Sequence, residues 1–480
     1  MKNIVEYLLN NQSNNLFCKD DETQYTYPQA KQLVKSVACF FAEKNISKQP
    51  IMLKAERNCK TLLTILGIIL SNNYYVPVNP AYSQEKLSSI ITSSKVEYFV
   101  AFDNNNQDNL INFNYEDMIT CSYDQNVIDE LVKDFDENND MYTIYTSGST
   151  GSPKGVLKTQ KNMIAYITNF LQTFNFDCNL KIANQAPLFF DASMKDVYLA
   201  LATGGAIYFP DKSMFAMTIK LVEYLNQNQI NFISWVPSAL TIIVRLNTFK
   251  YIKPQYLKYV FFVGEVFMPK YLNMWLNELK DVKYVNLYGS TELAGVCLYK
   301  EIKNICEEDK AIPLGKALAN NKVYLVDGEI CVESDQIAKG YVNDEEKNSQ
   351  VFTYHDGIKV LKTGDFAYKN QDDDIVFSTR KDFQIKHMGY RIELQEIEIS
   401  IVALDYVASC CVLFDGDSDK IVAFLSLNKK IDNDVKTILT DLKAKLPSYM
   451  VPNKIKILQE LPLNFNGKID RTKLKQMIKE

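Results

Sequence analysis

Residues 145–155 read Tyr-Thr-Ser-Gly-Ser-Thr-Gly-Ser-Pro-Lys-Gly and follow a short strand-like run at residues 141–144. The glycines allow close approach of the backbone, while the hydroxyl groups and Lys154 offer hydrogen-bond donors to phosphate oxygens. Pro153 stands where a Walker loop would have its second glycine, so the spacing disfavours a kinase or GTPase P-loop. The composition predicts a phosphate-binding loop of another kind.

Helical and strand-like segments alternate along most of the chain. Stretches at residues 27–44 and 60–71 have the periodicity of amphipathic helices, and apolar runs at residues 98–102 and 258–263 are typical of buried strands. Such alternation is typical of layered α/β architecture with a substantial amount of parallel sheet. We therefore expect an α/β fold.

The pattern changes toward the C-terminus. Strand-like runs at residues 408–414 and 421–427 are followed by a helical stretch at residues 434–446, which indicates a smaller α+β unit. We predict a large N-terminal domain over residues 1–380 and a small C-terminal domain over residues 381–480.

Composition and charge limit the function. The chain has 480 residues, 47% of them hydrophobic and 23% charged, as in ordinary folded proteins. Lys and Arg number 53 against 58 Asp and Glu, and the net charge of -5 gives no general attraction to nucleic acid or anionic lipid. A nucleic-acid-binding role is not expected.

No membrane span or export is expected. The longest apolar run, residues 62–70, is too short for a membrane-spanning helix, which needs about 20 residues. Glu6 stands inside what would be the apolar part of a signal peptide. Ten cysteines without Cys-x-x-Cys spacing indicate neither a disulfide framework nor a zinc site. A cytoplasmic location fits this pattern best.

Histidine is nearly absent from the sequence. The only two histidines are His355 and His387. A histidine-rich metal centre is thereby excluded, and a Ser-His-Asp triad would have to use one of these two. We expect the chemistry to proceed without imidazole.

Five further motifs accompany the phosphate-binding loop. They are Phe189-Phe190-Asp191-Ala192-Ser193, Asn286-Leu287-Tyr288-Gly289-Ser290-Thr291-Glu292, Lys362-Thr363-Gly364-Asp365-Phe366, Arg380 to Glu398, and Asn466-Gly467-Lys468-Ile469-Asp470-Arg471. In this order the series resembles the adenylate-forming superfamily of acyl-CoA synthetases, amino-acid adenylation domains and luciferases. The resemblance spans nearly the whole chain. It implies a large N-terminal domain of mixed, mostly parallel sheets with packed helices, and a small, mobile α+β C-terminal domain.

The resemblance implies an ATP-dependent ligase that forms an acyl adenylate and releases pyrophosphate. A carboxylate that attacks the α-phosphorus of ATP is already a nucleophile. Such a site needs positioning and charge neutralisation rather than a general base. The scarcity of histidine agrees with this chemistry.

The ATP-binding roles carry over by resemblance, residue by residue. Glu292 would hold Mg²⁺, and Thr291 would contact the α-phosphate. Tyr288 would stack on adenine, while Asp365, assisted by Arg380, would accept the ribose hydroxyls. The residues expected around the β- and γ-phosphates are Thr146, Ser147, Gly148, Ser149, Thr150, Gly151 and Lys154. Those expected around adenosine also include Gly264, Glu265, Asn286 and Gly289.

Lys468 and the hinge complete the implied machinery. In the family, the lysine at the position of Lys468 bridges the substrate carboxylate and the α-phosphate. The small domain would rotate about Lys381 and Asp382, withdrawing Lys468 and bringing Gly389 toward the acceptor thiol. Gly389 suits this place because a missing side chain leaves room for a pantetheine arm.

The motif around Asp191 bears on the substrate. Asp191 stands at a predicted helix start, ahead of an apolar face formed by Met194, Val197, Tyr198 and Leu201. In amino-acid-activating members the corresponding aspartate pairs with the substrate ammonium, so the resemblance implies an α-amino acid. A simple N-cap aspartate is the alternative. The other pocket positions implied are Ala192, Lys195, Ser234, Phe261, Val263, Leu287, Gly295 and Val296.

Lys195 follows Asp191 by four residues, so the two share one predicted helical face. With Asp191 on the ammonium, Lys195 would bind a side-chain carboxylate, which resembles the peptide-synthetase pattern for glutamate. An i,i+4 ion pair on an exposed face is the alternative. We therefore expect an acidic amino acid, glutamate or aspartate, or else D-alanine, which would leave Lys195 unexplained.

The acceptor is expected to be a separate carrier protein. No carrier-serine motif follows Lys468. The sequence around Gly264-Glu265-Val266 is most similar to D-alanine:carrier protein ligases and peptide-synthetase adenylation domains. Ser290 replaces the usual proline, as in some acyl-CoA ligases, and Ser378-Thr379-Arg380 lacks the usual glycine. A carboxylate:CoA ligase is the enzyme alternative, and a nucleotide-binding scaffold without catalysis is the alternative from another class.

Overall fold

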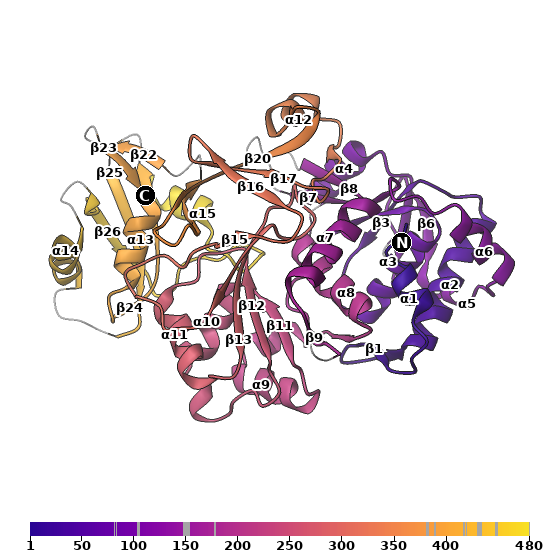
Figure 1. Ribbon diagram of the computed structural model, residues 1–480, viewed down its shortest axis with the longest axis horizontal. Helices are drawn as coiled ribbons and strands as arrows, with labels where there is room; N and C mark the ends of the chain where they lie inside the picture. Colours follow the sequence, from indigo (N-terminus) through magenta and orange to yellow (C-terminus); the bar gives the residue numbers. More distant parts are fainter. Residues whose placement is uncertain are drawn as a thin grey trace.

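The structure is a computed structural model that describes residues 1–80, 82, 84–102, 106–146, 154–176, 179–380, 384–387, 390–415, 418, 420–429, 434–446 and 450–479. A large N-terminal part of mixed, mostly parallel sheets and packed helices is joined to a smaller α+β C-terminal part (Figure 1). This arrangement confirms the predicted fold class. The domain boundary near residues 380–382 stays a prediction.

A seven-stranded sheet carries the predicted phosphate loop. Its strands lie in the order β18-β8-β7-β4-β3-β5-β6. They are β3 (Pro50–Lys54), β4 (Tyr74–Val78), β5 (Tyr98–Ala101), β6 (Ile111–Asn114), β7 (Asp140–Thr146), β8 (Lys154–Thr159) and β18 (Gly340–Tyr341). The strands from β7 to β6 run parallel, whereas β8 pairs antiparallel with β7 and β18. Thr146 lies opposite Lys154, so the β7–β8 hairpin brackets the predicted loop.

A nine-stranded sheet lies beside it, in the order β15-β14-β13-β12-β11-β9-β10-β1-β2. Its strands are β1 (Leu16–Lys19), β2 (Gln24–Thr26), β9 (Lys181–Ala183), β10 (Ala206–Tyr208), β11 (Phe232–Trp235), β12 (Tyr259–Val263), β13 (Lys283–Tyr288), β14 (Leu298–Ile302) and β15 (Lys316–Ala317). From β1 through β13 the neighbours are parallel, and the two ends of the sheet are antiparallel.

The remaining sheets are smaller. An antiparallel sheet contains β16 (Lys322–Val326), β17 (Glu329–Glu333), β19 (Phe352–His355), β20 (Ile358–Lys369) and β21 (Ile375–Arg380). The C-terminal part has a two-stranded ribbon, β22 (Gln384–His387) with β23 (Tyr390–Glu393), and a sheet of β24 (Val407–Asp415), β25 (Lys420–Leu427) and β26 (Lys454–Ile457).

Helices cover these sheets. They are α1 (Glu6–Asn10), α2 (Tyr27–Glu43), α3 (Cys59–Leu70), α4 (Gln84–Ser94), α5 (Tyr115–Thr120), α6 (Gln125–Lys133), α7 (Gln160–Thr173), α8 (Asp191–Thr203), α9 (Thr218–Gln227), α10 (Pro237–Arg245), α11 (Pro269–Glu278), α12 (Glu345–Val351), α13 (Leu394–Val402), α14 (Asp434–Lys445) and α15 (Arg471–Lys479). Two short 3₁₀ helices cover Lys212–Phe215 and Thr248–Lys250.

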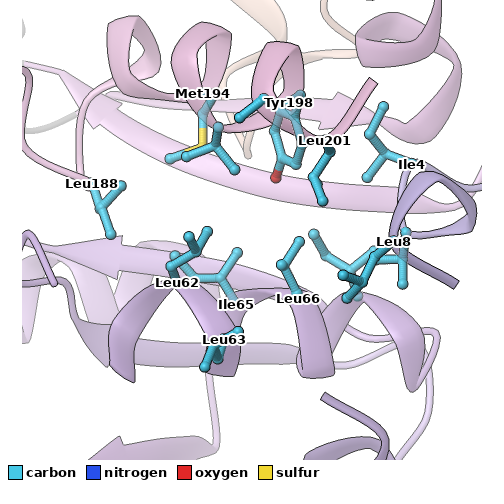
Figure 2. Close-up of a cluster of buried hydrophobic side chains, with 14 of the residues drawn as sticks. Ile4, Leu8, Leu62, Leu63, Ile65, Leu66, Leu188, Met194, Tyr198 and Leu201 are labelled. Carbon is cyan, nitrogen blue, oxygen red and sulfur yellow. The ribbon is translucent and has the colours of Figure 1, made fainter. Parts of the chain in front are cut away.

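The core between α3 and α8 places the start of α8. Leu62 and Leu66 of α3 face Tyr198 and Leu201 of α8, and Leu8 of α1 lies beside them (Figure 2). All of these side chains are buried, as is the whole of α3 apart from Lys60. The predicted apolar face of α8 is therefore confirmed.

Most elements expected from the sequence are present with small shifts at their ends. The helix expected at residues 27–44 is α2, whose N-terminus forms a capping box between Thr26 and Gln29. The helix expected at residues 60–71 is α3, which begins one residue earlier because the Asn58 side chain caps it. The predicted strands correspond to β5, β12, β24 and β25, and the predicted C-terminal helix to α14.

Helix α11 of the large part contacts the C-terminal part directly (Figure 1). Lys270 Nζ donates a hydrogen bond of 2.5 Å to Val407 O, and Tyr271 OH donates one of 2.5 Å to Ala408 O. Ile397 and Ile401 of α13 belong to the same apolar cluster as Leu272 of α11. Polar and apolar contacts together thus dock the C-terminal part against α11.

We expect Tyr271→Phe to loosen this docking. The change leaves the buried Ala408 carbonyl without its donor, which costs about 1–3 kcal/mol. Amide hydrogen exchange across β24 should accelerate in this variant. Tyr251→Phe is the matched control, because Tyr251 is 77% exposed. Equal protection of β24 in both variants would contradict the role of Tyr271.

Lys270 predicts a pH dependence of the same contact. Burial lowers the pKa of Lys270 to about 8, against opposing attraction from Glu308 and Asp405. Between pH 8 and the ordinary pKa of 10.5, the unfolded chain binds more protons at this residue than the folded one, so stability gained from Lys270 rises with pH. The free energy of unfolding of the wild type relative to Lys270→Met should therefore increase from pH 8 to pH 10. A flat difference would show that Lys270 does not titrate in this range.

Candidate active site

Three neighbouring strands bring four predicted pocket residues to one face of the nine-stranded sheet. Ser234 on β11 is paired with Phe261 on β12, and Val263 on β12 is paired with Leu287 on β13. Paired residues on neighbouring strands point to the same face, as do alternate residues along one strand. The four side chains therefore form one patch, which packs against the cluster that includes α7 and α8.

This patch and its surroundings contain buried hydroxyl groups without a partner. Ser234 Oγ, Ser290 Oγ and Tyr166 OH are shielded from solvent, and no hydrogen bond reaches them from the described residues. A buried hydroxyl that lacks a partner is unfavourable. A bound ligand with polar groups would satisfy them.

Two glycines are required where the chain folds back after β13. A Cβ on Gly289 would lie 2.3 Å from Gly295 O, and one on Gly295, whose φ is +72°, would lie 2.4 Å from the Tyr166 ring. The backbone passes too close at both places for any side chain. Val296, the last predicted pocket residue, follows directly and is buried.

Asp191 is the first residue of α8, with Phe190 as the N-cap. Tyr142 OH donates a hydrogen bond of 2.7 Å to Asp191 Oδ1, and Lys158 Nζ forms an ion pair with the same oxygen. The Asp191 side chain is 11% exposed, and from the described residues no hydrogen bond reaches its Oδ2. The N-cap alternative is therefore wrong, because the carboxylate binds other elements instead of capping its own helix. Ala192 follows Asp191 in the first turn.

Lys158 is a residue that sequence reasoning missed. Its side chain on β8 is fully buried, and its Nζ also donates a hydrogen bond of 2.7 Å to Leu293 O. Burial lowers the pKa of Lys158, and the charge of Asp191 opposes that shift. Lys158 lies two residues after Val156 on the same strand, so strand alternation places both on one buried face. That alternation could have indicated a buried lysine, but not its partner, because Asp191 lies 33 residues away in the chain.

Lys195 lies on α8 but does not contact Asp191. Its Nζ forms an ion pair of 2.5 Å with Asp196, which also accepts a hydrogen bond of 3.0 Å from Asn184. The exposed fractions of the Lys195 and Asp196 side chains are 2% and 1%. Burial raises the pKa of Asp196, and Lys195 opposes that shift. The alternative of an exposed i,i+4 ion pair is therefore wrong, while the role of Lys195 toward a substrate stays a prediction.

The residues predicted around the nucleoside converge from β13, β20 and β21. Tyr288 OH donates a hydrogen bond of 2.5 Å to Asp365 Oδ2, and Asp365 lies opposite Arg380 in the β20–β21 ladder. Burial, with the negative charge of Asp365 adding to it, raises the pKa of Tyr288, so its hydroxyl stays a donor. Asn286 Nδ2 donates to Pro313 O at 2.8 Å.

Glu292 lies beside the phosphate-loop hairpin. Tyr341 OH on β18 donates a hydrogen bond of 2.6 Å to Glu292 Oε1, and β18 pairs with β8. In the described residues no group of three His, Cys, Asp or Glu side chains is placed to hold a metal. Mg²⁺ is commonly bound by one or two carboxylates together with substrate phosphates, so a single carboxylate here fits that ion. Thr291 precedes Glu292 and is half-buried.

Lys468 reaches the large part from the C-terminal part. A turn closed by the Asn464 side chain, which accepts hydrogen bonds from Asn466 N and Lys468 N, presents it. Lys468 Nζ donates a hydrogen bond of 2.7 Å to Gly264 O, at the carboxyl end of β12. Burial raises the pKa of the adjacent Glu265, and the charge of Lys468 opposes that shift.

Some predicted residues lie outside the described part of the chain. They are Ser147, Gly148, Ser149, Thr150 and Gly151 of the loop, and Lys381, Asp382 and Gly389 of the hinge region. The side chains of Thr146 and Arg380 are likewise outside it. Their roles stay predictions.

Residues 6–342 match the family model described as AMP-binding enzyme, and residues 396–468 match that of the AMP-binding enzyme C-terminal domain. The chain belongs to the AMP-binding enzyme family. This AMP-binding enzyme is 31% identical to the D-alanine–D-alanyl carrier protein ligase of Staphylococcus aureus strain Newman, over 442 residues that cover 90% of each chain.

Two solved structures have the same fold as this AMP-binding enzyme. An anthranilate CoA ligase in complex with anthranoyl-AMP has a TM-score of 0.86 at 18% identity, covering 99% of this chain and 97% of its own. A four-domain nonribosomal peptide synthetase bound to AMP and glycine has a TM-score of 0.83 at 23% identity. The match covers 98% of this chain but 36% of the peptide synthetase.

Family membership establishes the reaction class. The AMP-binding enzyme is an AMP-forming ligase that uses ATP, as predicted. Among its described helices, none combines the length and apolar character needed to cross a bilayer.

Proposed function

We propose that this AMP-binding enzyme activates an amino acid as its aminoacyl adenylate and transfers the aminoacyl group to the phosphopantetheine thiol of a separate carrier protein. The observation that carries the proposal is the partly exposed carboxylate of Asp191, whose partner Tyr142 belongs to the apolar cluster that also contains Phe261 and Leu287. A carboxylate in such surroundings favours a ligand with a cationic donor, such as an α-ammonium group. The D-alanine–D-alanyl carrier protein ligase relative supports both the amino acid and the carrier protein.

In the first step, an oxygen of the substrate carboxylate would attack the α-phosphorus of ATP. The bond from that phosphorus to the oxygen bridging the β-phosphate breaks, and pyrophosphate leaves. Lys468 would neutralise the charge shared by the carboxylate and the α-phosphate, since its ammonium group already reaches the carboxyl end of β12. Thr291 would contact the α-phosphate, and the loop between β7 and β8 would hold the departing phosphates.

The nucleotide would be held by groups that already have fixed partners. Tyr288 donates a hydrogen bond to one carboxylate oxygen of Asp365, which would hold this carboxylate in place to accept the ribose hydroxyls. Glu292, held by Tyr341, would bind Mg²⁺, which supplies charge screening for the phosphates. Held carboxylates need little reorganisation during the reaction.

In the second step, the thiol would attack the carbonyl carbon of the adenylate, AMP would leave, and the thiol proton would pass to solvent. The C-terminal part would first rotate about Lys381 and Asp382, which withdraws Lys468 and brings Gly389 to the acceptor. Rotation requires the α11 contacts of Lys270 and Tyr271 to break and reform.

The substrate we propose is an acidic amino acid, glutamate or aspartate, or else D-alanine. A carboxylate:CoA ligase is the second candidate. It is favoured by Ser290, which stands in place of the usual proline and has a buried hydroxyl without a partner from the described residues.

Exchange of pyrophosphate into ATP across a panel of L- and D-amino acids, short fatty acids and aryl acids tests the proposal. We expect exchange with glutamate, aspartate or D-alanine, followed by loading of a phosphopantetheinylated carrier protein. Exchange with fatty or aryl acids alone, with transfer to free CoA, would contradict it.

Lys468→Ala should slow adenylation by about 3–4 kcal/mol of activation free energy, the scale for removal of one charge-stabilising donor. Transfer from preformed aminoacyl adenylate to the thiol should be retained, because the proposed rotation would withdraw Lys468 in that step. Single-turnover rates of the two half-reactions measure this difference. Lys475→Ala, at an exposed position of α15, is the control. Equal losses in both half-reactions would contradict the role of Lys468.

A further inference from the structure

Two buried lysine–aspartate pairs lie at the start of α8. Lys158 pairs with Asp191, and Lys195 pairs with Asp196. Three of these four side chains are at most 2% exposed, and Asp191 is 11% exposed. Each pair has zero net charge whichever atom holds the proton. The two pairs together therefore carry no net charge before any substrate binds.

Lys158 cannot easily leave Asp191. Its Nζ is also held by Leu293 O at 2.7 Å, and it lies 5.3 Å from the centre of the Tyr142 ring, whose hydroxyl binds the same Asp191 oxygen. Moving the ammonium group away would leave a buried charge unpaired. The positive charge next to Asp191 is thus a fixed feature of the folded chain.

The positive charge of Lys158 determines which net charge on the substrate is favourable at Asp191. A substrate ammonium group on Asp191 would lie close to Lys158, so that two cations would share the single carboxylate of Asp191. This excess of positive charge is unfavourable where water is excluded. A second carboxylate on the same substrate removes that excess. In an acidic amino acid the ammonium group and the side-chain carboxylate cancel, so that only the charge of the reacting carboxylate is added on binding.

An acid without an ammonium group would also add no net charge, but it fits the polar groups less well. Asp191 Oδ2 and the buried Ser234 Oγ receive no hydrogen bond from the described residues, and an apolar acid would leave both unsatisfied. An amino acid with two carboxylates can pair its ammonium group with Asp191 Oδ2 and accept a hydrogen bond from Ser234 Oγ with one of its carboxylates. These polar groups therefore favour an amino acid with two carboxylates over an acid without an ammonium group.

We propose that Lys158 is a specificity-determining residue that makes the enzyme select an amino acid with a second carboxylate over one with an uncharged side chain. The inference rests on the proposed function, because it takes Asp191 as the partner of the substrate ammonium. Lys158 is fully buried, so it acts through Asp191 and not by touching the substrate. It is therefore a positioning residue rather than a catalytic one.

Isosteric substrates test the charge effect on the unaltered enzyme. Glutamate and glutamine have nearly the same shape, as do aspartate and asparagine. We expect kcat/KM for pyrophosphate exchange to favour the better acid over its amide at least tenfold. A preference for the amides, or for alanine over both acids, would overturn the inference.

Lys158→Met tests the residue itself, since methionine keeps the length of the side chain and removes its charge. The acid-to-amide ratio of kcat/KM should fall at least tenfold, and exchange with alanine should rise relative to glutamate. Lys158→Arg should keep the wild-type preference, and Lys161→Met, at a half-exposed lysine three residues away, should leave it unchanged. An unchanged ratio in a Lys158→Met protein that melts as the wild type does would overturn the inference.

Lys195→Met separates the two lysines. If Lys195→Met abolishes the acid preference and Lys158→Met does not, selection belongs to Lys195 and the inference fails. The proposed function fails in a different way, namely when no amino acid supports exchange and fatty or aryl acids do. If Lys158→Met does not fold, Lys158→Gln, which removes the charge but keeps a donor for Leu293 O, takes its place in the same comparison.

Discussion

The buried ion pair between Lys158 and Asp191 is the contact on which the arrangement of the site depends. It joins β8 of the seven-stranded sheet to the start of α8, and the same ammonium group holds Leu293 O, next to Glu292 in the chain. Removing one partner of such a pair costs about 3–5 kcal/mol, because the other charge stays buried and unpaired. The β7–β8 hairpin, the start of α8 and the chain around Leu293 are therefore fixed relative to one another.

Around that contact, different layers of the fold supply different parts of the site. The parallel strands β11, β12 and β13 present the pocket patch, and the antiparallel ladder of β20 and β21 sets Asp365 opposite Arg380. Lys468 comes from the C-terminal part, whose position is held by α11. Because Lys468 belongs to the C-terminal part, its presence at the site depends on how the two parts of the chain are oriented.

Local sequence patterns predicted the elements well and the long-range partners poorly. The periodicity of residues 27–44 and the apolar face behind Asp191 both correspond to helices with buried sides. The spacing of Lys195 and Asp191 indicated neighbours on one helix, yet Lys195 pairs with Asp196 inside the protein. A buried charge must take a partner within reach, and the spacing of two residues along a helix does not say which of several nearby charges that is.

The sequence by itself determined the fold class, the family and the reaction, because the ordered motifs from the phosphate loop to Lys468 contain the groups that adenylate chemistry needs. Tertiary structure alone decided which side chains hold those groups: Lys158 and Tyr142 on Asp191, Tyr288 on Asp365, and Tyr341 on Glu292. These partners lie between 33 and 77 residues apart in the chain. Only packing of sheets and helices brings such distant groups within hydrogen-bonding distance, and burial then makes each pairing energetically necessary.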